Sequence, residues 1–199
     1  MRFQGFRGGP DRDLRLQWRR VHLRHPVPRD WRAWSALRAD SRAFLASWEP
    51  TWAYDALSRA AFRRRLKIYR TELRQGVTYS FLIFRAADGR LLGGITLSNL
   101  RRGVAQTATL GYWIGAPHAR QGYMSEALWA VLEYAFQGLG LHRVEAACLP
   151  DNEASRRLLL KAGFHEEGYA REYLRINGSW RDHQLFAILR GEFASRVTD

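Results

Sequence analysis

Apolar and polar positions alternate in some parts of the chain and recur at helical spacing in others. Residues 14–24 alternate, which predicts a first strand. Two prolines, Pro26 and Pro28, end this strand, and a helix is predicted from Pro28 to about Leu45. A second helix is predicted over about residues 57–76, where apolar side chains recur between arginines. The first part of the chain is therefore predicted to form one strand followed by two helices.

The middle of the chain has the periodicity of strands. Residues 77–84, 91–100 and 105–114 each alternate, and short glycine-containing turns separate them. Strands joined by such short turns are antiparallel neighbours in a sheet. We therefore expect three consecutive antiparallel strands here.

Helical spacing returns over residues 122–139, and a short apolar strand follows at residues 144–149. Since the strand at residues 105–114 precedes this helix, the order strand, helix, strand predicts a parallel crossover unit. A further helix is predicted from Asn152, a good N-cap, to the residue before Gly163, a good C-terminal stop.

Residues 164–189 are predicted to form a closing hairpin. The expected fold class is α/β (α+β), with a mixed, mostly antiparallel central sheet that contains one βαβ crossover. We expect a flexible basic leader over residues 1–13, a single domain over residues 14–190 and a C-terminal tail over residues 191–199.

Composition and charge narrow the class of protein. The chain has 199 residues, of which 46% are hydrophobic and 26% charged, as in an ordinary globular domain. Lys and Arg number 32 against 19 Asp and Glu, and the resulting charge of +13 favours polyanionic partners such as nucleic acid, the ribosome or a phosphate-rich cofactor. Nearly all of these cations are arginines, and coding bias in a GC-rich genome produces the same skew. Both explanations of the charge stay open.

Cysteine content and hydropathy bear on location. The single cysteine, Cys148, cannot form an intramolecular disulfide, which is typical of a reducing compartment. No apolar run approaches the roughly 20 residues that span a bilayer, and residues 1–13 lack the apolar core of a secretion signal. We therefore expect a cytoplasmic protein without a membrane partner. The histidines have no metal-binding spacing, so no metal site is predicted.

The stretch from Gly111 to Ala127 carries the first chemical signal. A strand ends in a Gly/Pro-containing loop that leads directly into a helix N-terminus, where free backbone N–H groups and the helix dipole favour an anion such as a pyrophosphate. Gly122 permits close approach of phosphates to the backbone, and Arg120 adds a cation able to make two hydrogen bonds. A glycine at such a junction can also serve turn geometry alone.

A second signal follows the crossover strand. Asn152 and Ser155 lie one helical turn apart and follow a strand end on the same side of the sheet as the phosphate loop. Ligands of such sheets bind at the carboxyl ends of strands. The alternative is that Asn152 only caps the helix and that Ser155 is an ordinary first-turn residue.

Together these motifs resemble the GNAT superfamily of acetyl-CoA-dependent N-acetyltransferases. The resemblance covers about Leu14 to Leu189. It rests on Tyr-Trp-Ile-Gly at 112–115, Arg-Gln-Gly-Tyr-Met-Ser-Glu-Ala at 120–127, and the segment from Asn152 through Ser155 to Ala-Gly-Phe at 162–164.

The similarity is closer to the RimJ/RimL group, which acetylates N-termini of ribosomal proteins. Trp-Glu-Pro-Thr-Trp at 48–52, Gly-Tyr-Ala at 168–170 and Trp-Arg-Asp-His at 180–183 resemble the RimJ branch.

The resemblance implies an acetyl-CoA site in which strand backbone pairs with the pantetheine arm and loop amides hold the pyrophosphate. The implied cofactor-binding residues are Trp113, Ile114, Gly115, Arg120, Gln121, Gly122, Tyr123, Met124, Ser125 and Asn152. Asn152 and Ser155 would lie near the thioester sulfur. Arg120 and Gly122 stand where two glycines are common in nearer relatives, but the backbone amides survive this change.

The expected catalytic residues are Ser155, Glu172 and Asn152. Many family members carry a tyrosine acid four residues after the position of Ser155, where this chain has Leu159. Ser155 or water must then protonate the departing thiolate. Candidates for the base are Glu172, Glu126 and Glu49, of which we prefer Glu172, although a solvated strand glutamate is the alternative reading of that residue.

The most favoured acceptor is the N-terminal α-amine of a ribosomal protein. An α-amine of pKa about 8 costs only about 1.4 kcal/mol to deprotonate at pH 7, so it needs only a weak base. The basic surface would then aid encounter with the ribosome or rRNA. The alternatives are a small-molecule amine, such as an antibiotic or polyamine, and a non-catalytic RNA-binding module on the same fold. The oligomeric state stays open.

Overall fold

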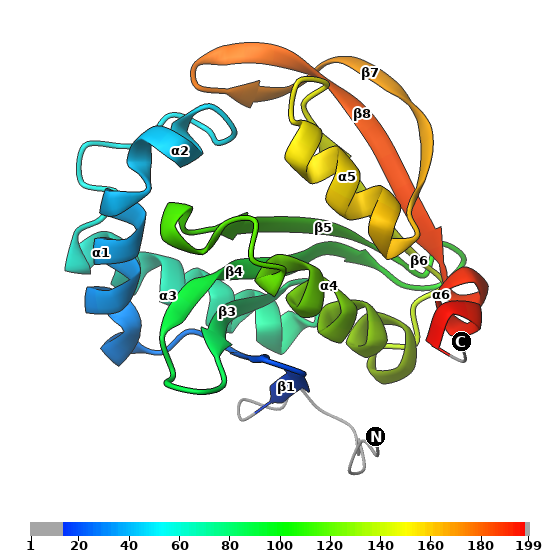
Figure 1. The fold of residues 1–199 in the computed structure, drawn as a ribbon, viewed down its shortest axis with the longest axis horizontal. Helices are drawn as coiled ribbons and strands as arrows, with labels where there is room; N and C mark the ends of the chain where they lie inside the picture. The colour runs from blue at the N-terminus through cyan, green and yellow to red at the C-terminus, as the bar shows by residue number, and fades with distance from the viewer. Residues whose placement is uncertain (1–13, 198–199) are drawn as a thin grey trace.

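An eight-stranded sheet forms the centre of the molecule in a computed structural model that describes residues 14–197 (Figure 1). Residues 1–13, expected to be a leader, and residues 198–199 lie outside the described chain. The strands in chain order are β1 (Arg15–Trp18), β2 (Val21–Arg24), β3 (Tyr79–Arg85), β4 (Leu91–Arg101), β5 (Thr107–Ile114), β6 (Arg143–Cys148), β7 (His165–Ile176) and β8 (Ser179–Leu189).

The spatial order of the strands is β1-β2-β3-β4-β5-β6-β8-β7. Within the described part of the chain, β5 and β6 form the only parallel pair, and all other neighbours are antiparallel. The predicted mixed, mostly antiparallel sheet with one βαβ crossover is therefore confirmed.

The predicted first strand is wrong in one respect, because residues 14–24 form two strands rather than one. Trp18 pairs with Val21 across a two-residue turn, and Arg19 adopts a φ of 43° there. The apolar positions shift from even to odd numbers between Trp18 and Val21, so the sequence carried a sign of this turn.

Helices and short turns of helix connect and cover the strands. They are η1 (Pro28–Asp30), α1 (Trp31–Asp40), α2 (Arg42–Ala46), α3 (Arg59–Gln75), η2 (Ala116–His118), α4 (Tyr123–Glu133), η3 (Tyr134–Gly138, a π-helical turn), α5 (Glu153–Ala162) and α6 (Arg190–Val197). The helix predicted from Pro28 is interrupted at Ser41, which is fully buried and whose hydroxyl accepts the Ala116 amide at 2.9 Å. The end of α1 is thereby fixed to the loop after β5.

Where a C-terminal tail is expected from residue 191, the structure instead has α6. Phe193 of this helix is 2% exposed and packs against Trp129 and Phe136, with ring centroids 5.3 Å apart in each pair. The end of the chain therefore contributes to the core that α4 shares with the sheet.

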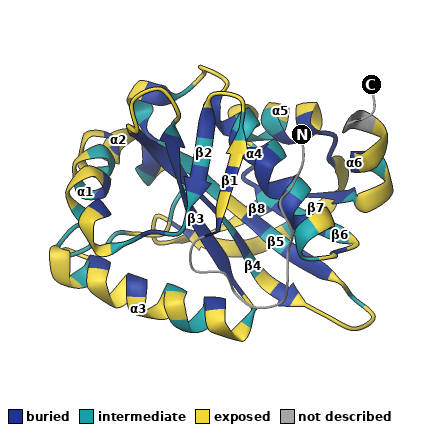
Figure 2. Ribbon diagram, turned by 90° about the horizontal axis from the view of Figure 1, so that it is seen from below, coloured by how far each residue is buried: buried dark blue, intermediate teal, exposed yellow. Residues whose placement is uncertain are grey.

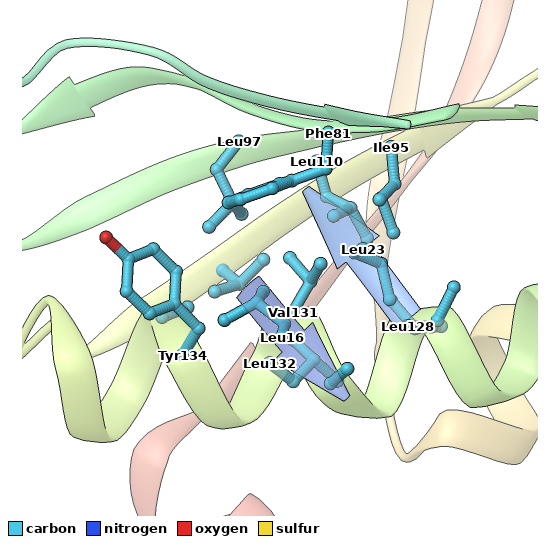
Figure 3. Close-up of a cluster of buried hydrophobic side chains, with 14 of the residues drawn as sticks. Leu16, Leu23, Phe81, Ile95, Leu97, Leu110, Leu128, Val131, Leu132 and Tyr134 are labelled. Carbon is cyan, nitrogen blue, oxygen red and sulfur yellow. The ribbon is translucent and has the colours of Figure 1, made fainter. Parts of the chain in front are cut away.

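Apolar clusters occupy both faces of the sheet. Between the sheet and α4 lies the larger cluster, in which side chains from β1 to β5 meet those of α4 and η3 (Figure 3). On the other face, Trp34 of α1 and Phe62 and Leu66 of α3 pack against Leu82 and Phe84 of β3. Because successive strand side chains point to opposite faces, β3 is buried on both sides. The result is three layers, with helices on either side of the sheet (Figure 2).

Candidate active site

The sheet divides between β5 and β6. These strands pair only from Thr107 to Leu110 on β5 and from Arg143 to Ala146 on β6. Beyond this point β5 continues along β4, and β6 continues along β8. The two halves of the sheet therefore separate at the carboxyl ends of β5 and β6.

The register of β5 determines which backbone groups face this split. Gly115 donates its N–H to the Leu92 carbonyl at 2.8 Å, so Trp113 in the same phase also directs its backbone groups toward β4. Backbone groups of successive strand residues point to opposite sides, so Tyr112 and Ile114 direct their N–H and C=O groups toward the split. Of the predicted strand residues, Ile114 therefore offers free backbone groups, whereas the backbone of Trp113 is used within the sheet.

Two adjacent glycines of β4 accommodate Trp113, Gly94 facing its side chain and Gly93 its backbone. A Cβ on Gly94 would lie 2.5 Å from the Trp113 Nε1 atom, and a Cβ on Gly93 would lie 2.3 Å from the Trp113 carbonyl oxygen. No side chain larger than hydrogen fits at these positions. The periodicity of the strand does not reveal this pair, although consecutive glycines within a strand indicate a close approach of backbone.

The predicted phosphate loop has the geometry of an anion site. Arg120 (φ 59°) and Gly122 (φ 84°) both adopt left-handed backbone conformations immediately before α4. No side chain caps the N-terminus of α4, so the amides of its first turn, from Tyr123 to Ser125, stay available. Successive N–H groups in such a bend form a concave nest that favours anions.

Arg20, from the β1–β2 turn, adds a fixed cation beside this loop. Its Nε donates to Glu126 Oε1 at 2.7 Å, its backbone N–H donates to Glu126 Oε2 at 2.9 Å, and its Nη2 donates to the Gln121 carbonyl at 3.1 Å. The guanidinium also lies 4.8 Å from the ring centroid of Tyr123. Its hydrogen bond to Glu126 raises the pKa of Arg20. Glu126, one of the base candidates, is therefore occupied in holding Arg20 against α4.

Ser155 and Asn152 occupy the first turn of α5, at the end of the split. Asn152 Oδ1 accepts the Ser155 backbone N–H at 3.1 Å, which confirms the predicted N-cap. The Ser155 hydroxyl lies 2.6 Å from the hydroxyl of Tyr112, which reaches it from β5. Burial raises the pKa of Tyr112, and it also raises the pKa of the neighbouring Cys148 thiol. Cys148 is thus kept protonated and of low reactivity.

A cleft of about 720 Å³ opens on the face of the sheet that carries α1 and α3, opposite α4. Its lining extends to Gly111, Tyr112 and Trp113, where β5 leaves β6. The phosphate loop and the cleft therefore lie on opposite faces, and the split in the sheet lies between them.

An arginine held among tryptophans forms one wall of the cleft. The Arg38 guanidinium lies 5.6 Å from the ring centroid of Trp34, 4.4 Å from that of Trp52 and 4.9 Å from that of Trp113. Both of its terminal nitrogens donate to Glu49, which also accepts the Trp52 Nε1–H at 2.7 Å. The carboxylate of Glu49, a second base candidate, is therefore fully engaged. Trp52, from the Trp-Glu-Pro-Thr-Trp segment, lines the cleft.

The tip of the β7–β8 hairpin is tied to this same wall. Asn177 donates its backbone N–H to the Glu49 carbonyl at 3.0 Å, which joins the hairpin turn to the loop between α2 and α3 (Figure 1). Two distant segments of the chain thus meet at the rim of the cleft.

Glu172, the preferred base, lies on this hairpin where the β7–β8 register is irregular. Its φ is 47° and its backbone N–H donates to Asp182 Oδ1 at 2.8 Å. Its side chain is exposed, and within the described residues no hydrogen bond joins it to Ser155 or Tyr112. Bulges of this kind re-aim side chains beside functional sites. His183, from the Trp-Arg-Asp-His segment, is 3% exposed and contacts the Arg181 carbonyl and the Tyr173 ring.

These features fit acetyl-CoA. The nest before α4 suits a pyrophosphate, and the free strand edge at Tyr112 and Ile114 suits an amide-containing arm.

Among residues 14–195, no group of three or more His, Cys, Asp or Glu side chains is arranged to hold a metal ion. No helix in the described chain is long and apolar enough to cross a bilayer.

Comparisons with known proteins agree with this geometry. Residues 20–165 match the model of the acetyltransferase (GNAT) domain. The chain is 42% identical to the probable N-acetyltransferase YjcK of Bacillus subtilis over 77% of this chain and 84% of that protein. It is 35% identical to the [ribosomal protein uS5]-alanine N-acetyltransferase of Escherichia coli over 88% of this chain and 90% of that protein.

Among solved structures, Mycobacterium smegmatis RimJ in complex with CoA-disulfide superimposes with a TM-score of 0.86 at 32% identity, covering 96% of this chain and 95% of that one. The match to the domain model spans both the phosphate loop and the Asn152–Ser155 turn. The chain therefore belongs to the GNAT family and is an N-acetyltransferase that uses acetyl-CoA.

Proposed function

We propose that this enzyme transfers the acetyl group of acetyl-CoA to the N-terminal α-amine of a ribosomal protein. Similarity to the uS5-alanine acetyltransferase supports this acceptor, because it extends over most of both chains. The proposed setting is the cytoplasm, where ribosomal proteins are made.

The charge of the cleft is the observation that carries the choice of acceptor. The carboxylates that line it are Glu49 and Asp55, and each is paired with an arginine, Arg38 and Arg64 respectively. Antibiotics of the aminoglycoside class and polyamines are multiply charged cations, which need unpaired carboxylates to offset repulsion from a protein of charge +13. The cleft offers none, whereas the α-amine of a peptide N-terminus brings a single positive charge.

In the proposed mechanism the amine attacks the thioester directly. Acetyl-CoA supplies an activated acyl group whose leaving thiolate has a pKa of about 8.5. The first-turn amides of α4 and Arg120 bind the pyrophosphate, and the Ile114 N–H polarises the acyl carbonyl. Most of the rate then comes from orientation of the two reactants on this rigid strand edge.

Ser155 and Tyr112 stabilise the leaving group as a pair. A serine hydroxyl has one proton to donate and two lone pairs to accept. When Tyr112 donates to Ser155 Oγ, the serine proton is left to donate to the departing sulfur. The pKa of a tyrosine is ordinarily above that of the coenzyme thiol, and burial raises the pKa of Tyr112 further, so the pair acts by hydrogen bonding and full proton transfer is not required.

Glu172 or an ordered water receives the amine proton. An α-amine of pKa about 8 loses its proton for about 1.4 kcal/mol at pH 7, against about 4.6 kcal/mol for a lysine of pKa about 10.4. An exposed carboxylate on the β7–β8 hairpin, such as that of Glu172, is therefore a sufficient base for an α-amine.

The test is mass spectrometry of deacetylated ribosomal proteins after incubation with the enzyme and acetyl-CoA. We expect one added acetyl group on the α-amine of a single protein, with strongly reduced transfer by Ser155→Ala at matched concentration and time. Spermidine and an aminoglycoside are assayed in parallel. Transfer to either of these without modification of any ribosomal protein would replace the proposed acceptor by a small amine.

A further inference from the structure

Four exposed basic side chains follow one edge of α3. They are Arg63, Lys67, Arg70 and Arg74, whose spacing of four, three and four residues places them in one stripe along the helix. The apolar face of α3 is buried against the sheet, so the stripe sits on a rigid support (Figure 2).

The stripe forms one wall of a groove of about 770 Å³. The opposite wall is the connection from β2 to η1, residues 25–28, and the floor includes Leu66 and Leu73. This groove lies on the face of the sheet opposite α4, so it is separate from the phosphate loop.

No carboxylate neutralises the stripe. Among residues 14–195, none of its four members forms an ion pair, and Arg74 has only a hydrogen bond to Thr71 at 3.4 Å. Elsewhere on the same helix Arg64 is paired with Asp55 at 2.5 Å, and beside the groove Arg24 is paired with Asp30 at 2.7 Å. The uncompensated charge is therefore concentrated in the groove.

We propose that this groove binds the phosphate backbone of RNA. From Arg63 to Arg74 the stripe extends about 16 Å at about 1.5 Å per helical residue, so its charges lie along a line and match a chain of phosphates rather than a single anion. Three of the four cations are arginines, whose planar donors suit phosphate oxygens. The inference goes beyond acetyl transfer and supplies a means of holding the enzyme at an RNA-rich substrate.

The experiment is fluorescence anisotropy of a labelled single-stranded RNA titrated with the full-length enzyme at several salt concentrations. The test variant is R63Q/K67Q/R70Q/R74Q. The matched control, R101Q/R102Q/R157Q/K161Q, removes the same charge from exposed positions outside the groove. Thermal unfolding and CoA binding establish that both variants are folded.

The slope of log affinity against log salt changes by about 0.7 for each phosphate contact on a single strand, so we expect the groove variant to lose about 3 units of slope and the control to keep the wild-type slope. Equal losses in both variants would overturn the proposal, since the charge would then act diffusely. Displacement of the RNA by polyglutamate at equal charge concentration would also overturn it, in favour of an acidic protein partner. The anisotropy assay contains neither acetyl-CoA nor an acceptor. A negative result for RNA binding therefore leaves the proposed acetyl transfer unaffected, and a negative result for acetyl transfer leaves the proposed RNA binding unaffected.

Discussion

The hydroxyl groups of Tyr112 and Ser155 lie 2.6 Å apart, although one residue belongs to β5 and the other to α5. The two elements flank the split between β5 and β6, so this hydrogen bond spans the split. The phenol of Tyr112 thus takes a place near Ser155 in a chain that carries Leu159 where many relatives have a tyrosine acid.

Tyr112→Phe should lower kcat about five- to tenfold and leave the KM for acetyl-CoA nearly unchanged, because the lost hydrogen bond contributes about 1 kcal/mol. In a Ser155→Ala background the same change should have almost no further effect, since Tyr112 acts through Ser155. A double-mutant cycle in kcat measures this coupling. Additive losses would mean that Tyr112 acts independently of Ser155.

The hydrogen bond between Tyr112 and Ser155 can also be tested without an acceptor substrate, through the pKa of the thiol of bound CoA. The thiol of bound CoA should have a higher pKa in Tyr112→Phe than in the wild type, because the hydrogen bond to the thiolate is weakened. Thiolate absorbance titrated with pH measures this pKa, with the S-methyl-CoA complex subtracted to remove Cys148 and tyrosine signals. An unchanged thiol pKa would assign Tyr112 a purely structural role.

Gly122→Ala should weaken CoA binding about tenfold and destabilise the fold by about 1 kcal/mol, since a left-handed backbone is costly for alanine. The added Cβ would also lie 3.1 Å from Arg20 Nη2, the cation beside the phosphate loop. Gly89→Ala is the matched control, because Gly89 has a φ of 68° and open space around it. Calorimetric titration with CoA should separate the two variants, whereas their loss of stability should be similar.

Glu49→Gln should destabilise the protein by about 2 to 3 kcal/mol, because it leaves the charge of Arg38 without its partner. The Arg38 side chain is only 11% exposed, so water compensates poorly. Asp55→Asn is the control, since its partner Arg64 is 62% exposed, and it should cost less than about 1 kcal/mol. Urea unfolding measures the loss of stability in both variants. Equal losses would show that the tryptophan-lined site does not strengthen the ion pair between Arg38 and Glu49.

Glu172→Gln should reduce kcat on an N-terminal peptide about tenfold at pH 7, which is less than is usual for general bases, because an α-amine costs only about 1.4 kcal/mol to deprotonate. The loss should shrink as pH rises past the amine pKa of about 8, because the substrate then arrives unprotonated. Glu167→Gln, on the same strand but paired with Arg143, is the control. A pH–rate profile that is identical for Glu172→Gln and the wild type would assign proton removal to water.

Phe193→Ala should destabilise the domain by about 3 kcal/mol, as is usual for removal of a buried phenylalanine. Thermal or denaturant unfolding measures the change. Phe44→Ala is the control, since Phe44 is 43% exposed. A loss no larger than that of the control would mean that α6 contributes little to the core.

Local signals explain most of what the sequence alone could predict. Asn152 as an N-cap and Gly163 as a left-handed stop (φ 97°) are confirmed, because both depend on neighbouring residues. The strands and the crossover follow from periodicity in the same way. The break at Ser41 escaped prediction, since Ser41 is buried there against Ala116, a hydrogen-bond partner that lies far along the chain.

Contacts between distant segments account for the parts of the site that could not be predicted. Arg20 and Glu126 are 106 positions apart, and nothing near Arg20 in the sequence marks it as a neighbour of the phosphate loop. The bond between Tyr112 and Ser155 depends likewise on the place of α5 beside the divided sheet. Such relationships depend on tertiary packing, which single-chain patterns do not encode.

The short parallel pairing of β5 with β6 has a mechanical consequence. Within the described chain, β5 and β6 pair only along residues 107–110 and 143–146. Ala108 and Val144, which pair there, are both fully buried, so a larger side chain at either position would have to displace one half-sheet relative to the other. We expect such a substitution to alter the separation of β5 from α5, where Tyr112 meets Ser155.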